Sequence, residues 1–343
     1  MTKAHDPMPT KKGPTTRIAA LDFAKGALVL LMVLYHWLNY FVASEGNFYR
    51  YLRFVTPSFI FITGFLISNV YLSRYDINDA GLAKRLAQRG VRLMAVFIGL
   101  NLIISQLVHS GQTIGDAWSS RNLSAIYLSG NTELANGKVA SFYILVPISY
   151  LLLAAAGLLA VSRYKYIFLY AFGVVLSVVL GLQWYGIKIP NLEHLAIGLL
   201  GISVGYLSVG RINAMASYPY AIIAGYIAYL AAITIWNVIY PLQIVGVCLN
   251  VMIIYLLGTT GGGVWGARQA VILLGKYSLI GYIAQIVILQ VLFKASHTMD
   301  LGWIGRAACL LAAAVLTLFS VEVLHRMRGK SPAIDGLYRA VFA

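Results

Sequence analysis

Charged residues are scarce in this sequence. Only 11% of its 343 residues are Asp, Glu, Lys or Arg, whereas 60% are hydrophobic. This balance excludes a soluble globular domain. Cysteine is almost absent as well, and Cys248 and Cys309 both fall within apolar segments, where they say nothing about the redox compartment.

Long apolar runs recur up to the C-terminus, each close to the roughly 20 residues that a helix needs to cross a bilayer. They predict an all-α, polytopic integral membrane protein of about ten transmembrane helices. The expected spans are residues 18–42, 52–73, 91–109, 141–161, 165–182, 192–209, 219–238, 242–258, 269–293 and 303–325.

The net charge of +15 at pH 7 at first suggests a nucleic-acid partner, but the distribution of Lys and Arg indicates topology instead. With the N-terminus inside, the inner segments carry 17 of these residues and the outer segments seven, which satisfies the positive-inside rule. We therefore expect both termini to be cytoplasmic and no nucleic-acid partner. Residues 1–16 lack the apolar core of a signal peptide and are expected to form a cytoplasmic tail, residues 17–328 a transmembrane domain, and residues 329–343 a second cytoplasmic tail.

The first apolar segment contains three ionisable residues, Asp22, Lys25 and His36. Eleven helical steps separate Lys25 from His36, which puts both on one helix face about 16 Å apart along the axis. Asp22 lies three residues before Lys25, close enough to pair with it. Because charges inside a span are costly, they usually line a site or a water-filled path. His36 is expected in the outer half of the membrane, as a general base, a nucleophile or a satisfied structural histidine.

Other candidates lie at the two membrane surfaces. Arg89 and Arg92, in a helical-looking run over residues 83–92 at the inner side, could clamp a phosphate or anchor anionic lipids. Glu193 and His194 open the sixth expected span from outside, where they could supply a base or cap the helix. Tyr277 and Ser278 add hydrogen-bonding groups within the ninth span and could equally serve packing.

Four ordered motifs resemble the membrane-bound acyltransferase-3 superfamily, which includes glucan-succinylating and heparan-glucosaminide acetyltransferase-like branches. Residues 21–26 (LDFAKG), followed by His36, look like the opening LD..RG motif and its histidine. Residues 59–68 (FIFITGFLIS) are similar to the second-span FFxxSGFLI. Residues 89–92 (RGVR) match R-x-x-R, and residues 274–278 (LGKYS) are similar to LGxxS.

This resemblance implies acyl transfer, with acetyl-CoA the expected donor, from cytoplasmic acyl-CoA to a hydroxyl or amine of an extracytoplasmic glycan. It gives His36 the catalytic position, places Arg89 and Arg92 at the arginine pair, and implies no metal. Two positions depart from the family pattern. Lys25 occupies the position where arginine is usual and lacks the planar guanidinium group of arginine. Gln285 lies near the position at which many family members carry a late histidine. The implied location is the cell (inner) membrane.

The main alternative is a proton-coupled transporter or flippase of a glycan or lipid-linked sugar, with Asp22, Lys25 and His36 as a relay. A membrane scaffold is disfavoured because it does not need charges within the first span.

Overall fold

The computed structural model describes residues 18–42, 49–72, 75, 80–108, 119–131, 141–164, 166–207, 209–236, 238–259, 265–296 and 302–342. These residues are almost entirely helical and include no strand, which confirms the all-α prediction. The tail predicted at residues 1–16 lies outside the described residues.

Eight helical segments are long and apolar enough to cross a membrane: α1 with η1 (Ala19–Val42), α2 to η2 (Tyr49–Leu72), α4 (within Ala80–Val108), α8 (Ile167–Trp184), α11 (Pro219–Trp236), α12 (Tyr240–Thr259), α14 (Ser278–Ser296) and α15 (Trp303–Lys330). Two further expected spans are also helices at the predicted places, namely α7 (Leu145–Val161, 17 residues) and α9 (Pro190–Val204, 15 residues). The chain is thus a polytopic membrane protein.

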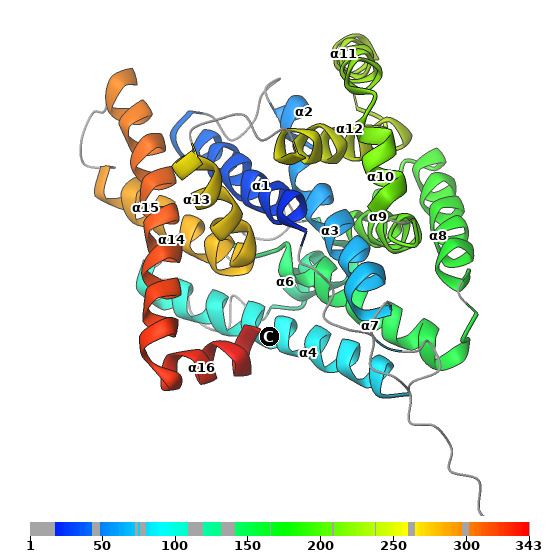
Figure 1. The fold of residues 1–343 in the computed structure, drawn as a ribbon, viewed down its shortest axis with the longest axis horizontal. Helices are drawn as coiled ribbons and strands as arrows, with labels where there is room; N and C mark the ends of the chain where they lie inside the picture. Colours follow the sequence, from blue (N-terminus) through cyan, green and yellow to red (C-terminus); the bar gives the residue numbers. More distant parts are fainter. Residues whose placement is uncertain are drawn as a thin grey trace, which may run out of the picture.

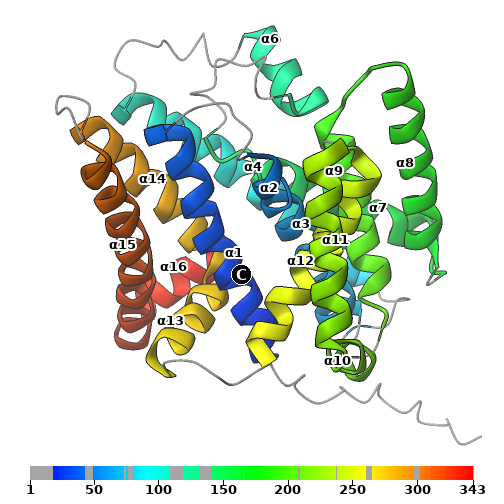
Figure 2. The same ribbon diagram turned by 90° about the horizontal axis from the view of Figure 1, so that it is seen from above.

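Helix α1 (Ala19–Trp37) lies at the centre of the bundle (Figure 1), followed directly by a π-helical turn, η1 (Leu38–Val42). It packs against α12 and α3 (Val55–Leu66) on one side and against α13 (Trp265–Lys276), α14 and α15 on the other. In Figure 2, α13 and α10 (Val209–Ala216) lie at the end where α1 begins, opposite α6 (Ser120–Leu123). The topology prediction places the start of α1 inside and would therefore put α6 on the outer side.

Glycines set the closest helix crossings around α1 and α3. A Cβ built on Gly26 of α1 would lie 2.0 Å from the Val271 carbonyl oxygen of α13, and one on Gly275 would lie 1.6 Å from the Asp22 carbonyl oxygen. A Cβ on Gly64 of α3 would lie 2.1 Å from the Gly198 carbonyl oxygen of α9. Backbones approach this closely in membranes where small residues meet. All three glycines belong to the sequence motifs described above.

Helices α8 and α11 lie at the edge of the bundle and leave large apolar side chains exposed. Soluble proteins rarely expose such extensive apolar surface, whereas lipid covers it at no cost. Exposed tryptophans stand at the expected outer ends of three spans, namely Trp184, Trp236 and Trp303. Tryptophan is enriched at both membrane–water interfaces, so these residues mark the ends of their spans.

Three elements differ from the sequence-based expectation. The ninth expected span, residues 269–293, consists of two helices, α13 and α14, that meet at Tyr277. The third span extends inward as α4, whose 29 residues begin at Ala80 and include the run predicted as helical. The segment predicted as a tail at residues 329–343 contains a helix, α16 (Pro332–Phe342).

Candidate functional site

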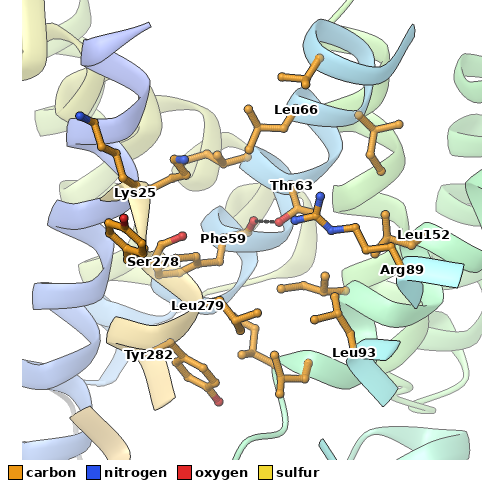
Figure 3. A pocket seen from close by; sticks show the side chains of 18 of the residues that line it. Lys25, Phe59, Thr63, Leu66, Arg89, Leu93, Leu152, Ser278, Leu279 and Tyr282 are labelled. Atoms are coloured by element: carbon orange, nitrogen blue, oxygen red, sulfur yellow. Dashed lines mark hydrogen bonds between the residues drawn. The ribbon is translucent and has the colours of Figure 1, made fainter. Parts of the chain in front are cut away.

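A cavity of about 250 Å³ opens in the half of the bundle where α1 begins (Figure 3). Its walls come from α1, α3 with the π-helical turn η2 (Ile67–Leu72), α4, α7, the α13–α14 junction and α16. Apolar and polar side chains both contribute to these walls. The polar lining residues are Lys25, Thr63, Tyr71, Arg89, Lys276, Tyr277, Ser278, Tyr282 and Tyr338.

Three cations line the cavity. The Lys25 ammonium pairs with the buried Asp22 carboxylate at 2.7 Å, which confirms the predicted ion pair. Arg89 enters from the opposite wall, as Figure 3 shows, and its guanidinium donates a hydrogen bond to the Tyr71 hydroxyl. Lys276, at the end of α13, completes the set. With one carboxylate paired to Lys25, this group keeps an excess of positive charge facing the cavity.

The break between α13 and α14 brings a helix N-terminus to the same place. The Tyr277 N–H still bonds to the carbonyls of Leu273 and Leu274, whereas the Gly281 N–H bonds to the Tyr277 carbonyl, which starts a new helix. The first residues of that helix, Ser278 and Leu279, line the cavity. The positive end of α14 therefore adds to the field of the three cations, and anions are favoured at such ends.

Apolar side chains line the cavity beyond the cations. Leu93 and Leu279 lie on the same side as Tyr282, which stands at the end far from Lys25 (Figure 3), and Ile144 and Leu145 also line the cavity. The Tyr282 ring packs edge-on against Phe142 at 6.3 Å between centroids, which fixes its position. A ligand that fits this cavity combines an anionic part near the cations with an apolar part beyond them.

His36 does not line this cavity. It lies farther along the unbroken α1, about 16 Å from Lys25 by helical rise, immediately before the π-helical turn. The half-buried imidazole packs edge-on against Tyr35 (5.3 Å), which in turn packs against Tyr49 (5.6 Å). Within the described residues the imidazole has no hydrogen bond, so no carboxylate of that part orients it.

Gln285 of α14 lies near the level of His36. One turn earlier, a Cβ on Gly281 would lie 3.3 Å from Val29 of α1, and farther along Gln290 donates a hydrogen bond to the Tyr40 hydroxyl at 3.2 Å. His36 lies between Val29 and Tyr40, as Gln285 lies between Gly281 and Gln290. The Gln285 side chain is fully buried, and neither amide atom has a partner in the described part of the chain.

The pair Glu193–His194 belongs to a separate cluster at the start of α9. The Glu193 carboxylate accepts a hydrogen bond from Gln183 (2.7 Å), and its backbone carbonyl accepts one from the Tyr240 hydroxyl (2.7 Å). The His194 ring lies 6.2 Å from that of Tyr143, and its buried Nδ1 has no partner among the described residues. This pair therefore lies away from the cationic cavity.

Asn191, in the same turn of α9, was not among the expected site residues. Its side-chain amide donates hydrogen bonds to the carbonyls of Ile126 (3.0 Å) and Tyr127 (3.1 Å), and its oxygen accepts one from Tyr143 (2.6 Å). Ile126 and Tyr127 belong to the π-helical turn η3 (Ser124–Ser129) that follows α6. The η3 turn is thereby held against α9.

The structure thus brings Lys25, Arg89, Tyr277 and Ser278 to one cavity, with Asp22 paired behind Lys25. It does not bring Arg92 there, since this exposed side chain lies outside the lining. The places of Lys276, Tyr71 and Tyr338 in the cavity were not expected from the sequence. A lysine inside an apolar segment was the available signal for Lys276, whereas nothing in the pattern marked the two tyrosines.

Residues 18–323, most of the chain, match the acyltransferase-3 family model, which describes an acyltransferase domain. No curated protein and no solved structure matches the chain.

Proposed function

The chain belongs to the acyltransferase-3 family and is a membrane acyltransferase, and from this premise we propose its donor, acceptor and catalytic residue. The protein transfers an acyl group, in the first instance acetyl, from cytoplasmic acyl-CoA to a hydroxyl or amine of an extracytoplasmic glycan. Its location is the cell (inner) membrane.

The observation that carries the proposal is the gathering of three cations in one cavity that also has apolar walls. Acyl-CoA carries phosphates at one end and a thioester on a thin, largely uncharged arm at the other. Lys25, Arg89, Lys276 and the N-terminus of α14 suit the phosphates, and the apolar walls suit the arm. The cavity lies in the half of the bundle where the topology prediction places the cytoplasm, from which acyl-CoA comes.

His36 is the proposed catalytic residue. In direct transfer, an imidazole nitrogen takes the proton of the acceptor hydroxyl or amine while the acceptor attacks the thioester carbonyl. The C–S bond then breaks and the CoA thiolate leaves, to be protonated by the imidazolium or by solvent. In two-step transfer, an imidazole nitrogen attacks the thioester carbonyl, the C–S bond breaks and the CoA thiolate leaves. The acceptor then attacks the acyl-histidine, the N–acyl bond breaks, and the acceptor proton passes to the released imidazole or to solvent. Both routes need the thioester to pass Tyr282 and reach His36.

The other assigned residues bind substrate in this proposal. Arg89 and Lys25 hold the donor phosphates, Asp22 fixes the Lys25 ammonium, and Tyr277 and Ser278 contact the donor at the start of α14. Arg92 assists donor binding at the inner surface. Glu193 and His194, at the outer side, contact the glycan.

The test uses purified protein, radiolabelled acetyl-CoA and a glycan fraction from the cell envelope. We expect release of free CoA and transfer of label to the glycan, and His36→Ala to lower the rate by roughly 10²–10⁴-fold. Leu337→Ala, on an exposed face of α16, is the matched control with unchanged rate. Label transfer at the wild-type rate by His36→Ala would remove His36 from the chemistry. Movement of glycan across vesicles without CoA release would favour a transporter.

A further inference from the structure

The C-terminal helix α16 folds back over the cationic cavity. The chain turns at Ser331, where the backbone is extended, and α16 then runs from the end of α15 toward α4 (Figure 1). Its Tyr338 is one of the residues that line the cavity. A segment expected from its sequence to be a tail therefore forms part of the cavity wall.

One face of α16 docks onto the bundle. Ile334, Asp335, Tyr338 and Val341 are partly buried, at the spacing of one helix face, whereas most other described residues of α16 are exposed. The docked face combines aromatic, charged and apolar groups.

Asp335 and Tyr338 make the principal contacts. The Asp335 carboxylate accepts hydrogen bonds from Arg328 of α15 at 2.5 and 2.9 Å. The Arg328 guanidinium lies 3.7 Å from the centroid of the Tyr338 ring, and that ring packs against Tyr277 at 5.6 Å. Tyr277 in turn shares a hydrogen bond of 3.0 Å with His325 Nδ1. Such contacts, near the membrane surface, are individually weak and can be broken and re-formed.

The cavity is also too small for the proposed donor. Pockets for drug-sized ligands have volumes of about 300–1,000 Å³, and a nucleotide-bearing thioester is larger than such ligands. The described cavity of about 250 Å³ holds only part of it. The remainder must lie at the inner mouth, where α16 is found.

We propose that α16 is the movable inner wall of the donor site, with Tyr338 as a donor-binding residue and the Asp335–Arg328 contact as the latch. The helix swings away to admit the donor and release CoA, and it docks again over the bound molecule. The identity of the donor and the argument from cavity size rest on the proposed function, whereas the contacts of α16 do not.

A cysteine-accessibility experiment tests the movement without any donor. Thr63, whose hydroxyl bonds only to its own helix at the Phe59 carbonyl, is replaced by cysteine in a chain carrying Cys248→Ala and Cys309→Ala. A membrane-impermeant maleimide is applied to inside-out vesicles. We expect Asp335→Asn, or removal of residues 332–343, to raise the labelling rate at least fivefold, and Leu337→Ala to leave it unchanged. Equal rates in all of these variants would overturn the proposal.

The second arm uses CoA as the probe for Tyr338. CoA should protect the cysteine at residue 63 from labelling, and Tyr338→Ala should raise the half-protecting concentration about tenfold, with Tyr338→Phe restoring most of the loss. An unchanged value in Tyr338→Ala would remove Tyr338 from the donor site. If α16 controls labelling but CoA gives no protection, the movable wall stands and the proposed donor fails. Thermal unfolding of each variant verifies that it is folded.

Discussion

Replacement of Gly275 by alanine tests the backbone crossing between α1 and α13. A Cβ at this position would lie 1.6 Å from the Asp22 carbonyl oxygen and 3.0 Å from the Gly26 nitrogen. Ordinary contact begins at 3.4 Å, so the two helices must separate locally by about 1.8 Å. Both atoms belong to helix backbone, which cannot rotate away as a side chain would.

The expected loss of stability follows from two opposing effects. Alanine is favoured over glycine in a helix by about 1 kcal/mol. Overpacking of a close contact costs about 1–3 kcal/mol, and a clash with backbone belongs at the upper end. We therefore expect Gly275→Ala to lower the free energy of unfolding by about 2 kcal/mol. Because Asp22 pairs with Lys25, the same shift should also weaken donor binding.

Gly266→Ala is the matched control, because Gly266 lies in the same helix and a Cβ there would meet nothing within 4 Å. This variant should be stabilised slightly, by about 0.5–1 kcal/mol. Thermal unfolding in detergent and acetyl-CoA turnover are measured for both variants. Equal stability of the two proteins would show that the crossing is not as close as described.

Three further predictions concern buried or latching groups. Asp22→Asn leaves the Lys25 ammonium without its carboxylate and should lower the free energy of unfolding by about 3–5 kcal/mol. Unfolding measurements on the double variant Asp22→Asn/Lys25→Met should show that much of this loss is regained. Gln285→Leu removes an amide without described partners and should stabilise by about 1–3 kcal/mol, whereas a lower melting temperature would mean that the amide is hydrogen-bonded. The hydrogen bond from Arg328 lowers the pKa of Asp335, so the latch is complete above the ordinary carboxylate range and weakens as the pH falls through the lowered pKa. The labelling rate of the cysteine at residue 63 is taken relative to that of Asp335→Asn at the same pH, so that the pH dependence of the thiolate fraction cancels. This ratio should be well below one at neutral pH and should rise toward one in that acid range.

The sequence was sufficient to predict the helical class, the positions of most spans and the Asp22–Lys25 pair. These features depend on local properties of the sequence, because hydropathy predicts a transmembrane span and a spacing of three residues predicts an ion pair on a helix. The helical run at residues 83–92 was predicted for the same reason, and α4 confirms it.

Other features depend on contacts between distant segments. A window of mean hydropathy cannot detect a break at the single residue Tyr277, so α13 and α14 were expected as one span. Arg89 and Arg92 are close in sequence, yet only Arg89 lines the cavity, because the packing of α4 decides which side faces inward. Tyr338 lines the cavity because the chain turns at Ser331, and no apolar pattern in the sequence predicts this turn.

The unbroken course of α1 from Ala19 to Trp37 restricts how the length of the chain can vary. One residue inserted between Lys25 and His36 would rotate the imidazole by about 100° relative to the lysine and turn it toward another neighbouring helix. An insertion of seven residues would preserve the face to within about 20° but would move His36 outward by about 10 Å. Loops elsewhere tolerate insertions and deletions, whereas this interval of α1 should keep its length in any chain that uses the same two positions together.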